Sequence, residues 1–164
     1  MPNPILLGNL CSLLAACFTL LSAWSRDYKR IYLCQAAQCL VMAGANVFFA
    51  SLSGVTTFAL CALRNLLVAY GRFTPGACAF FVAAVAGLGL AANNRGAVGL
   101  LPVATTVLYT VGCLRWKTVR GARKNLIVNL GLWAVYDALI LDLVSCAVDA
   151  ASALTALARL KRDE

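Results

Sequence analysis

The sequence predicts an all-α, polytopic membrane protein with seven transmembrane helices. Of the 164 residues, 62% are hydrophobic and 12% are charged, whereas soluble domains have about 45–50% apolar and roughly 25% charged residues. Seven apolar runs follow one another along the chain, and the lysines and arginines fall almost wholly between them. Because so few charges could not cover a soluble core with a polar shell, an outer surface that faces lipid is the better explanation.

The apolar runs have the length of short membrane-spanning helices. They cover approximately residues 4–24, 31–50, 54–70, 76–92, 97–114, 125–141 and 143–158. A run of about 17 residues spans roughly 26 Å as a helix, which is short for a bilayer core, so several helices should extend into their loops. The breaks at 51–53 and around Asp142 are short, and a count of six helices is therefore the main alternative.

The distribution of charge favours seven helices, with the N-terminus outside and the C-terminus inside. With this topology every lysine and arginine except Arg95 lies toward the cytoplasm, as the positive-inside rule predicts. The first run has no basic residue before it, so we expect a transmembrane helix there rather than a signal peptide. Since topology accounts for the net charge of +8, we expect membrane lipids as partners and no nucleic acid.

The runs form a pattern of three helices, one helix and three helices. We place a first triple-helix bundle at 1–72, a linker helix at 73–94, and a second bundle with a basic tail at 95–164. In each bundle a basic loop joins the first two helices, and the third helix ends at an arginine, Arg64 or Arg159. The linker helix restores the orientation, so the pattern is a parallel repeat, a plan that places the solute site of transporters at the repeat interface.

Polar residues at helical spacing run along the helices of both bundles. The three stripes contain Gln35, Gln38, Met42 and Asn46; Asn125, Asn129, Trp133 and Asp137; and Ser145, Asp149, Ser152 and Arg159. Residues three or four positions apart lie on one face of a helix. Because a polar face is hard to assign to lipid, we expect these stripes to line a shared central cavity.

Two aspartates within the apolar runs are the sharpest candidates for solute binding. An aspartate at the centre of a transmembrane helix costs about 2.5–3.5 kcal/mol on insertion scales. Asp137 and Asp149 should both lie roughly 7–11 Å below the outer surface, where they could face each other. Such a pair could bind a proton or a cation, or accept hydrogen bonds from a polyhydroxyl or amine solute. The alternative is that Asp137 is interfacial and solvated.

Other residues could form a wall, a gate or a hinge. Trp133 near the middle of the membrane could stack on a sugar, nucleoside or cation, or it could simply pack against its neighbours. Arg64 and Arg159 would snorkel to the cytoplasmic surface, or they could pair with acids and form a gate. Pro102 should bend the fifth run and act as a hinge, unless the nearby glycines serve only close helix packing.

Composition argues against a metal or another cofactor. The sequence contains no histidine, and its eight cysteines form no C-x-x-C pair. Structural zinc and haem ligation are therefore poorly supported, and the cysteines are best explained as small packing residues. We expect no cofactor.

Several short motifs carry a resemblance to a known family. They are the Arg26-Asp27 pair with Arg30, the ALRN segment that ends at Arg64-Asn65, the segment 100–103, Trp133 with Val135 and the polar pair after it, and Arg159. With these motifs the chain resembles bacterial inner-membrane proteins of the YgjV type. That family is similar to the SWEET, SemiSWEET and PQ-loop group, whose members pack triple-helix bundles around a central solute site.

The resemblance implies a location in the bacterial inner membrane and a role for one residue. Trp133 fits the tryptophan that lines the pocket on the second helix of a bundle in the SWEET group. The pocket asparagines of that group do not carry over, because the middle of the third run has Thr56, Thr57 and Cys61. A sugar specificity therefore cannot be inherited.

Transport of a small polar solute is the functional hypothesis that these observations favour. Its expected binding residues are Gln38, Asn46, Asn129, Trp133, Asp137, Asp149 and Ser152. A membrane receptor or scaffold on the same plan is the alternative, and homo-oligomerisation is left open. An intramembrane aspartyl protease fits less well, because its Gly-x-Gly-Asp motif is replaced by Ala147-Val148-Asp149, so we expect no enzymatic activity.

Overall fold

The computed structural model describes residues 4–48, 52–91, 93, 96–139 and 143–162, and within them it contains seven α-helices and no strand. The helices are α1 (Pro4–Trp24), α2 (Tyr28–Phe48), α3 (Leu52–Ala69), α4 (Pro75–Ala91), α5 (Leu100–Arg115), α6 (Val119–Leu139) and α7 (Leu143–Arg162). The all-α prediction is confirmed for this part of the chain, including the separation of α2 from α3 and of α6 from α7.

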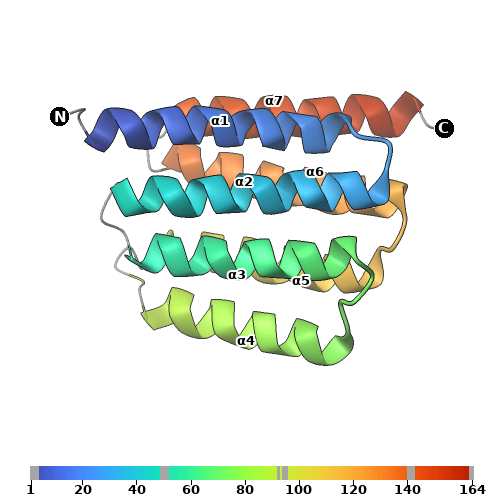
Figure 1. Cartoon of the computed structure of the whole chain (residues 1–164), viewed down its shortest axis with the longest axis horizontal. Helices are drawn as coiled ribbons and strands as arrows, with labels where there is room; N and C mark the ends of the chain where they lie inside the picture. The colour runs from blue at the N-terminus through green and yellow to red at the C-terminus, as the bar shows by residue number, and fades with distance from the viewer. Residues whose placement is uncertain (1–3, 49–51, 92, 94–95, 140–142, 163–164) are drawn as a thin grey trace.

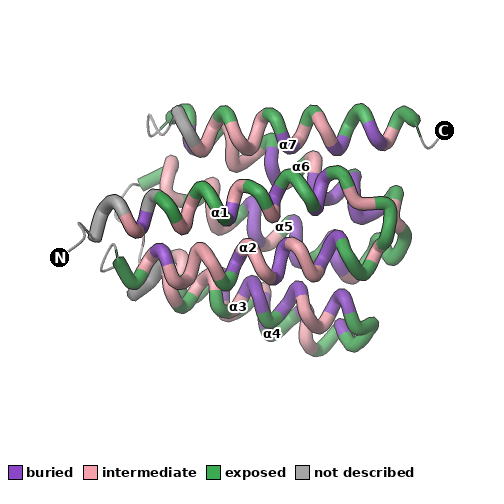
Figure 2. Tube along the Cα trace, turned by 45° about the horizontal axis from the view of Figure 1, so that its top comes forward, coloured by how far each residue is buried: buried purple, intermediate pink, exposed green. Residues whose placement is uncertain are grey.

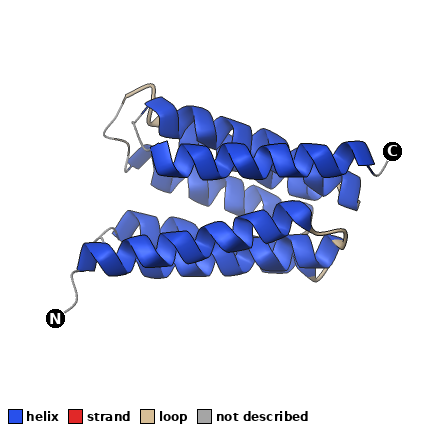
Figure 3. Cartoon of the chain, turned by 90° about the horizontal axis from the view of Figure 1, so that it is seen from above, coloured by secondary structure: helices blue, strands red, loops and turns tan. Residues whose placement is uncertain are grey.

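The helices lie in two layers (Figures 1 and 3). Helices α1 to α4 follow one another in the first layer, and α5 to α7 return in the second. Each helix packs against its neighbours in the chain, most extensively α2 against α1 and α3, and α6 against α7. Across the layers α1 packs against α7, α2 against α6, and α3 against α5, while α4 lies at the edge against α5 and α3.

The two ends of the bundle differ in charge. We call the end with the α1–α2, α3–α4 and α5–α6 connections and the C-terminus the basic end, and the end with the N-terminus and the α4–α5 connection the opposite end (Figure 1). Every lysine and arginine in the described part of the chain lies in the half toward the basic end. This segregation agrees with the distribution on which the N-out, C-in prediction rests.

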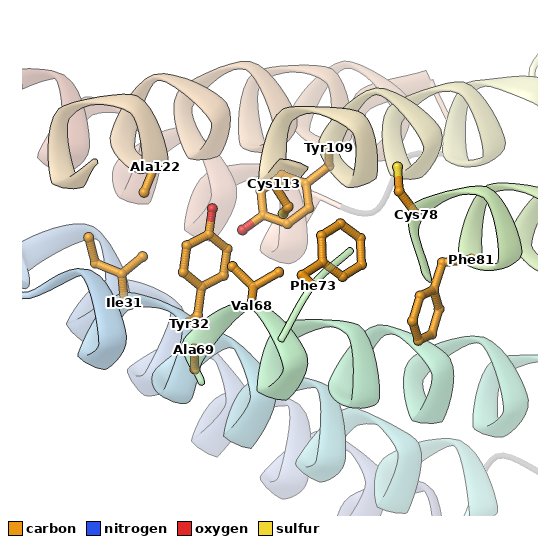
Figure 4. Close-up of a cluster of buried hydrophobic side chains, with 10 residues drawn as sticks. All are labelled: Ile31, Tyr32, Val68, Ala69, Phe73, Cys78, Phe81, Tyr109, Cys113 and Ala122. Atoms are coloured by element: carbon orange, nitrogen blue, oxygen red, sulfur yellow. The ribbon is translucent and has the colours of Figure 1, made fainter. Parts of the chain in front are cut away.

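The main hydrophobic core lies near the basic end (Figure 4). Ile31 and Tyr32 of α2 pack there with Phe73 and with Tyr109 and Cys113 of α5. A smaller cluster joins Ala23, Leu126, Leu130 and Ala156, and a third joins Cys39, Cys61 and Ala62. Tyr32 and Tyr109 turn their hydroxyl groups toward the same space between α2 and α5.

The outer surface is apolar on every helix. Leu13, Val47, Phe80, Leu108 and Leu154 are each more than half exposed, and buried and exposed positions alternate at helical spacing along α7 (Figure 2). Soluble monomers rarely show such extensive apolar surface, so lipid is the solvent that this surface fits.

Helix lengths give only partial support for seven membrane crossings. Within the described residues, α2 is the one helix that by length and composition alone could span a membrane. Shorter apolar helices cover Leu10–Trp24, Val55–Ala69, Pro75–Ala91 and Leu100–Arg115. Helix α6 begins at Val119, before the predicted run at 125, because its first turns contain charged residues and do not belong to an apolar run. Thr118 caps this start: its Oγ1 accepts a hydrogen bond from the amide of Gly121 at 3.1 Å. The number of crossings and the 3+1+3 division stay predictions.

Candidate functional site

A small cavity lies between α3, α4, α5 and α6 in the half toward the opposite end. Its volume is about 180 Å³. It is lined by Thr57, Val85, Gly89, Asn93, Gly99, Pro102, Val103, Thr106, Trp133 and Tyr136. None of these residues is charged, and the Trp133 ring stands edge-on to Tyr136 with ring centroids 5.7 Å apart. The described lining therefore offers an aromatic wall, two threonines and an amide to a small solute.

The cavity extends from the opposite end into the middle of the bundle. Asn93 and Gly99 lie in or next to the α4–α5 connection, whereas Thr106 and Trp133 lie six residues inside α5 and α6. Six residues of helix correspond to roughly 9 Å of depth. Helices α4 and α5 pack closely along one wall of the cavity. A Cβ added to Gly89 would lie only 2.3 Å from Val103 Cγ2, so the glycine permits this contact.

Below the cavity, buried polar side chains from five helices form a hydrogen-bonded polar layer. Its members are Ser22, Gln35, Arg64, Asn65, Tyr109, Thr110 and Asn125. All seven are at most 7% exposed. Buried polar groups are tolerated when they are hydrogen-bonded to one another, and such networks favour one arrangement of the helices.

Arg64 lies at the centre of the polar layer. Its Nε and one terminal nitrogen donate to Asn65 Oδ1 at 3.2 and 3.1 Å, and the other terminal nitrogen donates to Thr110 Oγ1 at 3.0 Å. The guanidinium also lies 4.7 Å from the centroid of the Tyr109 ring, a cation–π contact. The prediction that Arg64 could snorkel to the cytoplasmic surface is wrong, because these contacts hold a 4% exposed side chain inside the bundle.

The rest of the polar layer connects α5 to α1, α2 and α6. The Tyr109 hydroxyl donates to Gln35 Oε1, and Gln35 Nε2 donates to Ser22 Oγ at 3.1 Å. Asn125 Nδ2 donates to the Tyr109 carbonyl at 3.0 Å. Gly112 makes room for this amide, because a Cβ there would lie 2.1 Å from Asn125 Oδ1.

A hydrogen bond links the polar layer to the cavity. Thr110 Oγ1 donates to the carbonyl of Thr106 at 2.6 Å, and Thr106 lines the cavity. The layer is thus the floor of the cavity, and the main hydrophobic core lies beyond it toward the basic end. A solute in the cavity would have to cross both to reach that end.

Two further arginines tie segments together at the basic end. Arg123 is fully buried and donates to the carbonyls of Ser25, at 2.7 Å, and Arg159, at 3.5 Å. The Arg159 guanidinium lies 3.4 Å from the centroid of the Trp24 ring. Arg159 is therefore a contact between α7 and α1, and it borders an open hollow of about 440 Å³ with Trp24, the residues 25–27 and Arg30.

The structure brings only two of the predicted site residues to the cavity. Trp133 and Pro102 line it. The other predicted binding residues, which do not line it, are Gln38, Asn46, Asn129, Asp137, Asp149 and Ser152. The polar stripes of α2, α6 and α7 therefore do not converge on this cavity.

The remaining predicted residues have other surroundings. Asp137 is buried and Asp149 is half-buried, and both have polar or electrostatic partners. Asn46 Nδ2 donates to the Met42 carbonyl of its own helix at 2.8 Å. Gln38 Oε1 accepts from the Cys39 thiol at 3.3 Å. Ser152 is fully buried, and within the described residues its hydroxyl has no hydrogen-bond partner.

Sequence reasoning missed the polar face of α5. Thr106, Tyr109, Thr110 and Cys113 follow intervals of three, one and three, which place them on one side of a helix. The fifth run is interpreted above through Pro102, whereas the spacing of these four residues is itself the signal of a polar face. The described residues contain no group of three or more potential metal ligands.

The fold and the apolar surface together define a helical membrane protein. A family model described as bacterial inner membrane protein, Imp-YgjV, matches residues 6–162. The chain therefore belongs to the Imp-YgjV family of bacterial inner membrane proteins. No curated protein and no solved structure matches it, so the similarity to the SWEET, SemiSWEET and PQ-loop group stays a prediction.

Proposed function

We propose that this protein transports a small polar solute across the bacterial inner membrane and that the structure corresponds to a state open toward the opposite end. The observation that carries the proposal is the contrast along the bundle axis. A cavity with an aromatic wall reaches one end, and a polar layer followed by a hydrophobic core closes the other. Alternating access requires such a one-sided closure around a site near the midplane.

The packing of the helices supports a repeat of two triplets. Exchanging α1, α2 and α3 with α5, α6 and α7 converts the α1–α7 contact into the α5–α3 contact and leaves the α2–α6 contact in place. A parallel repeat about an axis along the membrane normal has this property. Helix α4 would be the linker that restores orientation, and the basic end would be cytoplasmic in the N-out, C-in topology.

The cavity residues suggest how a solute would be held. Trp133 offers a face for stacking, and Thr57 and Asn93 offer hydrogen-bonding groups. A volume of about 180 Å³ is below the roughly 300–1,000 Å³ of pockets for drug-sized ligands. The solute should therefore be small, and Pro102 in the wall is a candidate hinge.

Flux measurements in proteoliposomes test the proposal. Purified protein should move at least one member of a panel of small sugars, amines, amides and organic acids. Trp133→Ala should lower that flux by about tenfold because a stacking surface is lost. Trp116→Ala is the matched control, since Trp116 lies at the basic end outside the lining, and it should leave flux nearly unchanged.

The opposite outcome favours a receptor. If a panel member raises the melting temperature of the protein through Trp133 but crosses no membrane, the protein binds without transporting, and the transport proposal fails. The topology is checked separately, by fusing a reporter that folds only in the cytoplasm to the C-terminus. A periplasmic C-terminus would contradict the N-out, C-in arrangement.

A further inference from the structure

The open hollow at the basic end gathers arginines from three segments of the chain. Arg26 belongs to the α1–α2 connection, Arg30 to the first turn of α2, and Arg159 to the last turn of α7. The rest of its described lining consists of Trp24, Ser25 and Asp27, and its volume is about 440 Å³. We call this space the arginine hollow. It lies at the end of the bundle where the α1–α2 connection and the C-terminus meet, and α1 packs against α7 beside it (Figure 1).

The described lining of the arginine hollow carries an excess of positive charge. It contains three guanidinium groups and one carboxylate, that of Asp27. This carboxylate serves the backbone, since Asp27 Oδ1 accepts a hydrogen bond from the Arg30 amide at 2.7 Å. Arg26 and Arg30 are both exposed. Arginine is well suited to phosphate because its planar fork can donate two parallel hydrogen bonds to phosphate oxygens.

Arg159 has a different role in the wall of the hollow. Its guanidinium lies 3.4 Å from the centroid of the Trp24 ring, and the residue is only 8% exposed. This contact fixes the position of Trp24 and ties α7 to α1. The two exposed arginines, Arg26 and Arg30, are therefore the groups that a ligand in the hollow would meet first.

An apolar track on the outer face of α1 leads to the arginine hollow. Its side chains, which are between 39% and 64% exposed, are those of Leu13, Leu20, Leu21 and Trp24. Their spacing places them on one face of the helix. Tryptophan is enriched at the membrane–water interface, where its ring lies at the level of the lipid headgroups. A ligand that fits both features has a phosphate group in the hollow and an apolar chain along α1.

We propose that the arginine hollow binds the phosphate headgroup of an anionic phospholipid, such as phosphatidylglycerol, from the membrane leaflet at the basic end. The phosphate accepts hydrogen bonds from Arg26 and Arg30, and an acyl chain lies along Leu20 and Leu21. Basic pockets between transmembrane helices on the cytoplasmic side are known to recognise anionic headgroups. A lipid in this position would bridge the α1–α2 connection and α7. The inference concerns a lipid site and does not depend on which solute, if any, crosses the bundle.

Quenching of Trp24 fluorescence by brominated lipids measures the occupancy of the hollow. The chain has three tryptophans, so Trp116→Phe combined with Trp133→Phe leaves Trp24 as the reporter. This variant is placed in phosphatidylcholine bilayers at about 0.15 M salt, with increasing fractions of either phosphatidylglycerol or phosphatidylcholine that carries brominated chains. We expect phosphatidylglycerol to occupy the hollow about tenfold more strongly, because two arginines each strengthen the attraction severalfold. Equal quenching by the two lipids would overturn the proposal.

Two double variants of equal charge separate a site from a general attraction. Arg26→Gln with Arg30→Gln removes two charges from the hollow, and Arg72→Gln with Arg115→Gln removes two exposed charges from the same end outside its lining. The first pair should lower the preference for phosphatidylglycerol to about twofold or less. The second should change the preference by less than about twofold, because salt screens charges outside the site. If both pairs lower it equally, the basic end attracts anionic lipid as a whole and the proposed site is overturned.

Two further experiments exclude other occupants of the hollow. Glycerol 3-phosphate carries the phosphate without acyl chains; if millimolar amounts relieve the quenching by phosphatidylglycerol, the hollow recognises a soluble phosphate and the lipid assignment is overturned. Asp163→Asn with Glu164→Gln neutralises the last two residues, which lie outside the described part of the chain. If the preference for phosphatidylglycerol appears only in this variant, the tail of the chain occupies the hollow and the proposal is overturned. An unchanged preference in both experiments supports the lipid site.

Discussion

The two ends of the bundle are built differently. Toward the basic end, large apolar side chains such as Ile31, Tyr32 and Phe81 are fully or almost fully buried. In the half toward the opposite end, the described buried residues are mostly small or polar, such as Ala45 and Thr105, and the cavity lies among them. We call these two parts of the bundle interior the sealed half and the hollow half; the arginine hollow also lies at the basic end, but outside the main hydrophobic core.

Helix termini follow the same division. Asp27, Thr74 and Thr118 accept hydrogen bonds from backbone amides at the starts of α2, α4 and α6, all at the basic end. Helix α3 ends there at Ala69, and Gly71 in the turn that follows has a φ of +67°, which is favourable for glycine. At the opposite end, α5 begins after Gly99 without a side-chain cap. Side-chain caps thus stabilise the described helix starts at the basic end.

Thiol labelling should give the largest contrast between the ends. Val103→Cys places a thiol in the cavity, while the native Cys113 on the same helix is 2% exposed in the sealed half. A charged, membrane-impermeant thiol reagent should modify position 103 about a hundredfold faster than Cys113, because the buried site reacts only after the bundle opens. Site-resolved mass spectrometry measures both rates in one sample. Equal rates would mean that the two ends are equally open.

A methyl group added at Gly112 should be the most damaging small change in the sealed half. The new Cβ would meet Asn125 Oδ1 at 2.1 Å, and moving this 2% exposed amide breaks its bond to the Tyr109 carbonyl. We expect Gly112→Ala to cost about 1–3 kcal/mol and to lower the melting temperature clearly. Gly131→Ala on α6 is the control, since no atom lies within 4 Å of its added Cβ.

The same methyl group should be tolerated better in the hollow half. At Gly89 the new Cβ would meet the Val103 side chain at 2.3 Å, but Val103 borders the cavity and has room to turn. We expect Gly89→Ala to cost about 1 kcal/mol, less than Gly112→Ala. Combining it with Val103→Ala should remove the clash, and thermal melting of all three variants measures the difference. If Gly89→Ala lowered the stability of the protein as much as Gly112→Ala, the two halves would be packed equally tightly.

Removal of single caps should have the smallest effect. Thr74→Ala deletes the acceptor of the Ala77 amide, and Thr118→Ala deletes that of the Gly121 amide. Each should cost about 1 kcal/mol. Thr155→Ala serves as a control, because the Thr155 hydroxyl donates to the Ala151 carbonyl within its own helix and does not cap a helix start. If the two cap variants melted at the same temperature as the Thr155→Ala control, the caps would have no role in stabilising the basic end.

Much of the fold follows from hydropathy and charge. The predicted first run ends where α1 ends, and most other boundaries differ by a few residues, because apolar runs and turn residues are local signals. Helix α6 begins six residues earlier than the run at 125, because the charged residues of its first turns are excluded from an apolar run. Arg123 among them is nevertheless buried, and it donates to the Ser25 carbonyl of another segment. A hydropathy pattern treats every arginine as a surface residue, and a long-range contact of this kind lies outside what it can detect.

The site was less predictable than the fold. Trp133 and Pro102, which line the cavity, stand out in the sequence because each is unusual within an apolar run. The aspartates stand out for the same reason, but the rarity of a residue does not tell which face of a helix turns toward a cavity. For Arg64, a place near a helix end predicts the cytoplasmic surface or a gate with acids. Its actual partners, Thr110 and Tyr109, lie far away in the chain, and only the tertiary structure brings them together.

The contact between α1 and α7 also bears on how the protein is made. Helix α1 ends at Trp24, whereas α7, whose Arg159 covers the Trp24 ring, begins only at Leu143. At the usual rate of about 5–20 residues per second, roughly 6–24 s of synthesis separate the two. During this interval the face of α1 that finally meets α7 must be shielded by lipid or by the insertion machinery. The described bundle can therefore close only after α7 has been made, long after α1.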